Sequence, residues 1–239
     1  MQKIFLLILL FFTVNSCKKD NCILNSGKLV KKEFILDDFS QLEINKYFNV
    51  YITDDTINKI VIEGGENLLE NIETQIQNSI LTLKNNNKSY WLKKYDKINI
   101  YLSTSSLTHI TINEPSTLFS TNCIKRNSFG IEVRADIAKV NVNVDCNNFS
   151  LTIYDSTGDY VVKGSTKECF IYSRGTSLIH ADSLFSNNME IINCSACDAF
   201  INVNKKLIYN IIRKGNIYYL GDADDIKGEV SSSGKLIKL

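Results

Sequence analysis

Residues 129–153 read FGIEVRADIAKVNVNVDCNNFSLTI, and the fold class can be inferred from these residues. It holds alternating runs of apolar and polar residues at 129–133 and 149–153, with a third run, VNVNV, between them. Alternation with a period of two predicts β-strands that bury one face. The outer two runs each begin with a phenylalanine, Phe129 and Phe149, so the stretch indicates a structural repeat.

The repeat continues along the chain from Thr108 onward. Six segments of 18 to 21 residues follow one another: 108–128, 129–148, 149–168, 169–188, 189–206 and 207–224. Their third positions form an apolar series: Ile110, Ile131, Leu151, Ile171, Ile191 and Tyr209. One coil of about 20 residues cannot bury its own apolar face, so coils of this kind must stack on one another.

These patterns predict an all-β fold, a right-handed parallel β-solenoid (β-helix) of about six coils. The handedness follows the general rule for parallel crossovers, and glycines such as Gly175 supply the backbone angles that corners need. A β-sandwich is the alternative, but it predicts hairpin turns instead of ladders of like residues. We expect one domain over 28–239, with an N-terminal β-rich capping region at 28–106. The coils and a C-terminal cap occupy 107–239.

A short stretch inside the capping region has helical spacing. Leu68, Leu69, Ile72 and Ile76 recur at intervals of three and four residues, directly after a glycine pair. This spacing predicts a brief helix there.

The N-terminal residues have the pattern of a targeting segment. Lys3 is followed by a largely apolar run from Ile4 to Val14. At about 1.5 Å per residue in a helix, this run is too short for a bilayer core of about 30 Å. It predicts a secretory signal peptide over residues 1–16, and a buried N-terminal strand or helix is the alternative.

The residues after the leader resemble a bacterial lipoprotein signal, in which Cys17 is lipidated and becomes the first residue. Two or more acyl chains anchor a protein stably, so the resemblance implies the lipid bilayer of the outer membrane as a partner. Lys18-Lys19-Asp20 is similar to the charged tag that sends some Bacteroidetes lipoproteins to the cell surface. A periplasm-facing location is the alternative. Residues 17–27 then form the lipidated cysteine and a polar tether.

Charge and cysteine usage exclude several classes of function. Lys plus Arg number 27 against 26 Asp plus Glu, and this balance argues against a nucleic-acid partner. Cys194 and Cys197 have the spacing of a redox or metal site, but neither a second cysteine pair nor a nearby histidine completes a zinc site. We therefore expect no metal and no cofactor, and interpret these cysteines as structural. The two histidines, His109 and His180, lie more than three coils apart, so no nucleophile–histidine pairing and no catalytic residue are expected.

One outward ladder is a candidate for ligand binding. Arg134, Tyr154 and Arg174 follow one another on successive coils, with Glu132 and Tyr172 beside them. Arginine over tyrosine at the strand spacing of about 4.8 Å would form cation–π stacks. Such a strip of rings and guanidinium groups suits sugars or acidic groups. The alternative is that the strip only stabilises the sheet face.

Several motifs along the chain resemble one known family. The resemblance covers roughly residues 30–239 and rests on this spacing: Phe39-x-x-Leu42-x-Ile44, Phe48-x-Val50-x-Ile52, Ile60-x-Ile62-x-Gly64, Gly215-Asn216-Ile217-x-Tyr219-x-Gly221 and Ser232-Ser233-Gly234-Lys235-Leu236. The chain resembles the head GIN domain family of autotransporter-type adhesins, which is widespread in Bacteroidetes. The resemblance implies a β-solenoid and an exported protein.

Three functions remain open from the sequence. The first is a non-catalytic, adhesin-like surface module that binds a glycan or protein on a solenoid face. The second is a structural or scaffolding envelope lipoprotein without a soluble ligand, and the third is a polysaccharide-active enzyme. The absence of paired outward carboxylates in the sequence pattern counts against the enzyme.

Overall fold

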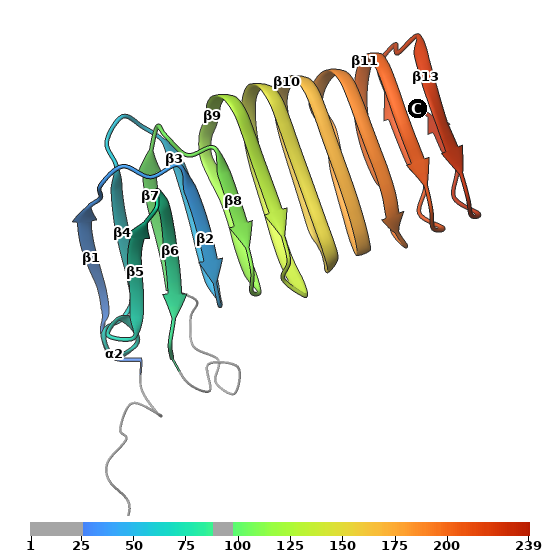
Figure 1. Ribbon diagram of the computed structural model, residues 1–239. Helices are drawn as coiled ribbons and strands as arrows, with labels where there is room; N and C mark the ends of the chain where they lie inside the picture. The colour runs from blue at the N-terminus through green and yellow to red at the C-terminus, as the bar shows by residue number, and fades with distance from the viewer. Residues whose placement is uncertain (1–25, 88–97) are drawn as a thin grey trace, which may run out of the picture.

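The computed structural model describes residues 26–87 and 98–239, which form one curled, open β-sheet around an apolar core (Figure 1). The all-β prediction is confirmed. The described chain has 14 strands and one short helix, α2 (Glu66–Leu69). The strands are β1 (Leu29–Ile35), β2 (Gln41–Asn45), β3 (Phe48–Asp54), β4 (Lys59–Gly65), β5 (Ile72–Gln77), β6 (Ile80–Asn85), β7 (Ile98–Thr104), β8 (His109–Ile112), β9 (Ser116–Val133), β10 (Ile137–Ser195), β11 (Ala199–Ile211), β12 (Ile217–Leu220), β13 (Asp225–Val230) and β14 (Leu236–Lys238).

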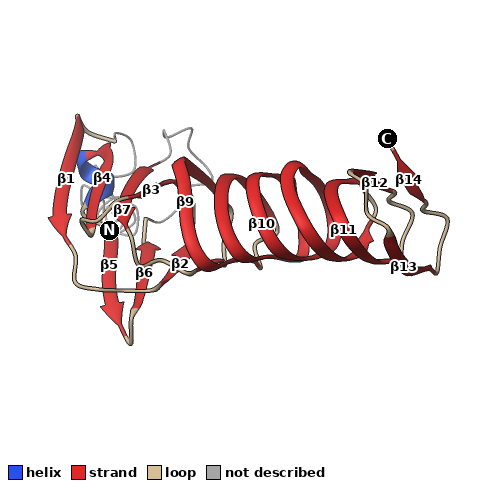
Figure 2. Cartoon of the chain, turned by 90° about the horizontal axis from the view of Figure 1, so that it is seen from above, coloured by secondary structure: helices blue, strands red, loops and turns tan. Residues whose placement is uncertain are grey.

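From β9 to β11 the chain winds in successive turns around one axis (Figure 2). The strands of neighbouring turns pair in parallel, so that Ile110 lies opposite Ile131, which lies opposite Leu151. Within the long β10, side chains one turn apart also bond to each other, as Ser165 does to Asp145 at 2.9 Å. These registers confirm the ladder of like residues at the positions that they cover.

The core consists of the inward-facing residues of these turns. Ile131, Val140 and Leu151 are almost fully buried, and the outward residues between them are more exposed. Burying one such side chain contributes about 1.5–3 kcal/mol. Because each inward residue lies between its counterparts on the two neighbouring turns, stacking stabilises turns that could not fold alone.

Glycine is required at one corner of the coils. Gly175 has a φ of +111°, in the left-handed region, and a Cβ there would lie 2.5 Å from the Ser156 carbonyl oxygen. Both the backbone angle and the close approach exclude a larger residue. The predicted role of this glycine is therefore confirmed.

The N-terminal strands join the same sheet in an order that differs from their order in the chain. β2 lies between β6 and β8, and β3 lies between β7 and β9. Gln41 is opposite His109 and Asn49 is opposite Thr117, so these partners are separated by several times the length of one coil. The strands β4 to β7 thus lie outside β2 and β3, away from the coils.

The far N-terminal end of the sheet is antiparallel. β1 pairs with β4, β4 with β7, and β5 with β6, all antiparallel. The helix prediction for this region is wrong in extent, because α2 ends at Leu69, and Ile72 and Ile76 lie in β5. A spacing of four residues places side chains on one face of a strand as well as of a helix, and pairing with β6 decided between them. Leu68 and Leu69 are buried against the core.

At the C-terminal end, β13 pairs with β11 and β14 pairs with β12, both in parallel. The leader at residues 1–16 and Cys17 lie outside the described residues. Within the described part of the chain, no helix has the length and apolar character needed to span a membrane.

Candidate functional site

The five residues of the candidate strip lie on one outer face of the sheet, which also carries β8 and β13. Glu132 is opposite Thr111 and Thr152, so its row follows the predicted register. Arg134 and Arg174 are exposed, and Tyr154 retains 40% of its accessible surface. The structure brings Glu132 into contact with Arg134 and Tyr154 into contact with Tyr172.

Both arginines of the strip donate a hydrogen bond to a carboxylate. The Arg134 Nε donates to Glu132 Oε1 at 2.5 Å, and an Arg174 Nη donates to Asp155. The bond to Asp155 is the main cause that raises the pKa of Arg174. The expected stacking of arginine over tyrosine thus gives way to ion pairs, which partly neutralise the guanidinium groups.

The two tyrosines of the strip contact each other. The ring centroids of Tyr154 and Tyr172 lie 5.6 Å apart at an interplanar angle of 47°. Burial raises the pKa of the Tyr172 hydroxyl, and the nearby Arg174 lowers it by a smaller amount. Neutral rings and paired charges make this strip better suited to an uncharged ligand than to an acidic one.

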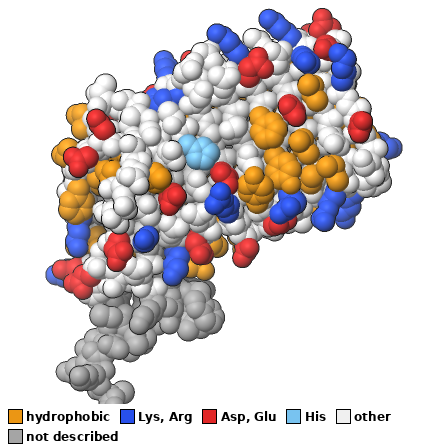
Figure 3. Space-filling model, in the orientation of Figure 1, with side chains coloured by type: hydrophobic (Ala, Val, Ile, Leu, Met, Phe, Trp, Pro, Cys, Tyr) orange, Lys and Arg blue, Asp and Glu red, His pale blue; other side chains and the backbone are white. Residues whose placement is uncertain are grey.

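Apolar side chains extend the strip toward the C-terminal end. Figure 3 shows hydrophobic side chains gathered over the turns of β10 and β11 on this face, with charged residues around them. Ile208 and Ile212 keep 37% and 41% of their surface exposed. An exposed cluster of apolar side chains on a sheet face is typical of an interaction site.

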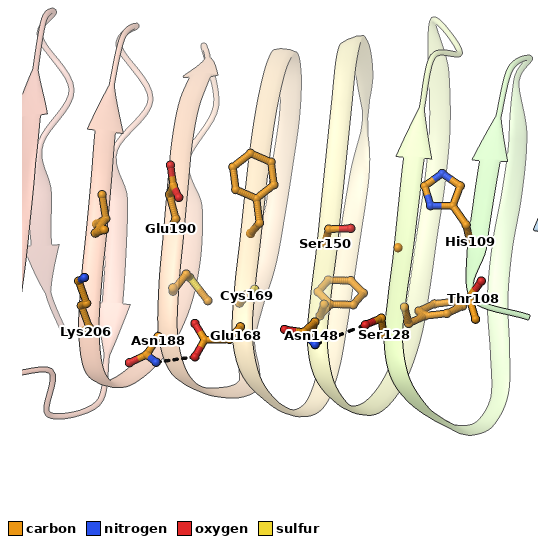
Figure 4. Close-up of a pocket in the computed structure, with 16 residues that line it drawn as sticks. Thr108, His109, Ser128, Asn148, Ser150, Glu168, Cys169, Asn188, Glu190 and Lys206 are labelled. Atoms are coloured by element: carbon orange, nitrogen blue, oxygen red, sulfur yellow. Dashed lines mark hydrogen bonds between the residues drawn. The ribbon is translucent and has the colours of Figure 1, made fainter.

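A trough runs along the same face, a few residues before the strip in each turn (Figure 4). Its volume is about 660 Å³, within the range of ligand sites. One side is a row of polar residues, in which Asn148 donates to Ser128 at 3.3 Å and Asn188 donates to Glu168 at 2.6 Å. This trough was not predicted from the sequence, although its rows follow the same period as the coils.

Two polar groups lie over the backbone of Gly130, in the floor of the trough. A Cβ on Gly130 would lie 2.8 Å from His109 Nδ1 and 2.8 Å from Ser150 Oγ, so both groups lean over this glycine. His109 Nε2 is 3.9 Å from Glu132 Oε2. The sequence predicted no histidine beside a hydroxyl nucleophile because its two histidines lie more than three coils apart, but His109 and Ser150 lie on either side of Gly130. The two groups are placed to bind one polar group of a ligand.

The opposite outer face carries two short stacks of rings. Tyr51 stacks on Tyr101 at 5.0 Å and on Phe119 at 5.4 Å between centroids. Farther along, Phe200 stacks on His180 at 5.4 Å and on Tyr218 at 4.9 Å. The second stack follows the period and could be found from it. The first joins residues that are distant in the sequence, which no local pattern indicates.

Comparison with known proteins identifies the family. Residues 38–223 match the family described as "Putative auto-transporter adhesin, head GIN domain". The chain belongs to this family. Its description as an adhesin suggests a cell-surface or envelope protein. No curated protein matches the sequence significantly.

Solved structures share the fold of this head GIN domain. A "putative adhesin" from Bacteroides fragilis matches with 19% identity and a TM-score of 0.80, over 89% of this chain and 97% of that one. A "putative adhesin" from Parabacteroides merdae has 18% identity and a TM-score of 0.60 over the same shares. A "Putative lipid binding protein" from Parabacteroides distasonis has 17% identity and a TM-score of 0.67, again over 89% and 97%. At these identities the likeness shows the fold.

An ion pair that the sequence did not reveal ties the two parts of this head GIN domain together. Arg126 Nη1 donates to Asp54 Oδ1 at 2.7 Å, and both side chains are largely buried. The same guanidinium donates to the carbonyl oxygens of Thr104 and Leu107, at 3.1 and 2.9 Å. The pair therefore joins β3 and β9 to the loop that leads back from the outer strands.

The cysteines among the described residues, Cys123, Cys146, Cys169, Cys194 and Cys197, are all free thiols. Cys194 and Cys197 flank the corner between β10 and β11, where Cys197 N donates to Ser195 Oγ at 3.0 Å. Burial raises the pKa of the Cys169 thiol far above its ordinary range. Among the described residues, no group of three or more His, Cys, Asp or Glu side chains could hold a metal ion.

Proposed function

We propose that this chain is a lipid-anchored, non-catalytic binding module of the bacterial cell surface. In this proposal residues 1–16 are a signal peptide, acylated Cys17 holds the protein on the outer membrane, and the tether places the sheet faces outside the cell. The winding is that of a right-handed parallel β-solenoid of about six coils.

One observation carries the proposal. The face with Tyr154 and Tyr172 presents contacting rings and exposed aliphatic side chains, while its arginines are paired with carboxylates. Solvated sheet faces usually alternate charged and polar residues without such a cluster. The family's description as an adhesin supports the same function.

Protease shaving of intact cells tests the location. Cells that make the protein are treated with protease and immunoblotted, with a periplasmic protein as the control for lysis. Selective loss of this protein supports the proposal. Protection until the cells are lysed contradicts it and favours an inward-facing structural or scaffolding role.

The anchor is tested separately. Mass spectrometry of the protein purified from membranes should show an N-terminus at Cys17 with attached acyl chains. Cys17→Ala should move the protein out of the membrane fraction, because the acyl chains supply the membrane affinity. A membrane-bound Cys17→Ala variant would contradict lipid anchoring.

A further inference from the structure

The trough has two parallel rows of outward side chains, one on each side of the first buried position of every turn. The first row is polar along its whole length: Ser128, Asn148, Glu168, Asn188 and Lys206. The second row is mixed: His109, Gly130, Ser150, Phe170, Glu190 and Ile208. Neighbouring members of a row are separated by the strand spacing of about 4.8 Å, so the six members of the second row span about 24 Å.

The second row has a gap in the middle. Gly130 has no side chain and Ser150 has a short one, whereas Phe170 on the next turn carries a ring. On the opposite face rings at the same spacing stack on each other and cover each other's surfaces. Phe170 has Ser150 as its neighbour on one side, so a ligand above Ser150 and Gly130 can contact the surface of its ring.

Polar groups surround this gap. His109 Nδ1 and Ser150 Oγ converge above Gly130, and Asn148 and Ser128 lie along the other row. Amides, hydroxyls and an imidazole both donate and accept hydrogen bonds, as recognition of sugar hydroxyls requires. An apolar ring with a few placed polar groups is the usual composition of a small-molecule site.

The charges select among possible ligands. Glu168 and Glu190 line the middle of the trough and Lys206 lies toward one end. Carboxylates accept hydrogen bonds from hydroxyl groups but repel an anionic chain. The trough therefore fits a neutral ligand better than an acidic polysaccharide.

We propose that this trough binds a neutral linear oligosaccharide that lies along the axis of the coils, with one sugar packed on Phe170 above Ser150 and Gly130. The length of the trough accommodates several sugar units in line. This inference rests on the proposed function as a binding module and names its ligand class.

The first experiment applies the purified full-length protein to an array of neutral linear glycans, with α- and β-linked hexose, pentose and N-acetylhexosamine chains, beside oligogalacturonides as anionic controls. We expect binding to at least one neutral chain, tighter for a hexasaccharide than for its trisaccharide. Binding to no neutral chain, or tighter binding to oligogalacturonides, overturns the inference.

Variants then locate the site by calorimetric titration with the best neutral hexasaccharide. Phe170→Ala should weaken binding by about tenfold, the size of a central aromatic contact. Ser150→Phe should abolish it, because a second ring would close the gap. Phe200→Ala removes a ring of similar exposure from the opposite face and should leave the affinity unchanged. Thermal unfolding of each variant confirms that it is folded.

Other outcomes separate this inference from the proposed function. If Arg134→Ala with Arg174→Ala abolishes binding and Phe170→Ala does not, the strip binds the glycan and the trough is excluded. If protease removes the protein from intact cells but the protein binds only another protein and no glycan, the proposed surface function stands and the glycan inference fails. Glycan binding by a protein that is protected from shaving contradicts the surface location only.

Discussion

The two parts of the sheet reach the same parallel packing by different means. In the coils from residue 107 onward, each strand lies beside the equivalent strand of the next turn, and like residues stack. In the N-terminal part, β2 and β3 lie beside strands that are distant in the sequence, and the strands outside them are antiparallel. The repeated part is therefore held by local register, and the N-terminal part by long-range contacts.

The two parts should therefore respond differently to the loss of a single contact. A solenoid's stability is approximately a sum over turns and the interfaces between them. The coils spread their stabilisation over many equivalent inward positions. The N-terminal part has a buried apolar core of its own, and it adds single contacts that no repeat duplicates, among them the Arg126–Asp54 ion pair and the bonds of Glu63 to Tyr101 and Lys31.

The largest expected effect is from a cavity in the core. Leu151→Ala and Leu81→Ala each remove a fully buried leucine and should destabilise the protein by about 2–5 kcal/mol. The two substitutions should destabilise different sets of strands. Hydrogen exchange should show lost protection on both sides of Leu151, but only in the N-terminal strands for Leu81→Ala, because contacts connect only neighbouring turns. Equal loss in β11 and β12 from both variants would contradict the comparison.

A corner of the coils should be the next most sensitive. Gly175→Val places a Cβ against the Ser156 carbonyl at a left-handed backbone angle. Such strain costs on the order of 1–3 kcal/mol, measurable by urea unfolding. Thr176→Ala, at the next position, loses one exposed hydroxyl contact to Thr157 and serves as the control. A stable Gly175→Val variant would show that the corner can rearrange.

The ion pair that joins the two parts should have a similar or smaller effect. Asp54→Ala leaves the largely buried Arg126 guanidinium without its carboxylate and should cost about 1–3 kcal/mol. The control is Asp222→Ala, since Asp222 is almost fully exposed beside Lys238 and such pairs contribute about 0–1 kcal/mol. If both variants unfold at the same urea concentration, the pair does not stabilise the junction.

The smallest effect concerns pH and the outer antiparallel strands. The hydrogen bond from Tyr101 is the main cause that lowers the pKa of Glu63, and Lys31 and Asn99 add to it. A carboxyl with a lowered pKa in the folded state stabilises above its unfolded value of about 4.3 and loses this contribution as pH falls through the folded value.

Glu63→Gln should therefore be less stable than the parent protein at pH 7, and this difference should shrink as the pH falls below the unfolded value of about 4.3. Urea midpoints at neutral and at acidic pH measure it. A difference that stays constant with pH would show that Glu63 acts through packing instead of charge.

Much of the coiled part could be predicted from residues alone. The series Ile110, Ile131 and Leu151 predicted the pairing that the structure has, and Gly175 predicted a corner. These predictions succeed because the period is written in neighbouring residues. The same period correctly predicted that the strip faces outward. It did not predict the carboxylate partners of the two arginines, which depend on the conformations of side chains near the corners.

The all-β fold, the register of successive turns and the inward faces follow from the amino-acid pattern, because alternation and period are local properties of the chain. The position of β2 and β3 between later strands and the contact of Arg126 with Asp54 are visible only in the folded chain. The same is true of the meeting of His109 and Ser150 above Gly130. Those contacts depend on how β2 and β3 pair with the distant strands β8 and β9, and on how side chains of neighbouring turns lean toward each other. Neither can be read from a local pattern of residues.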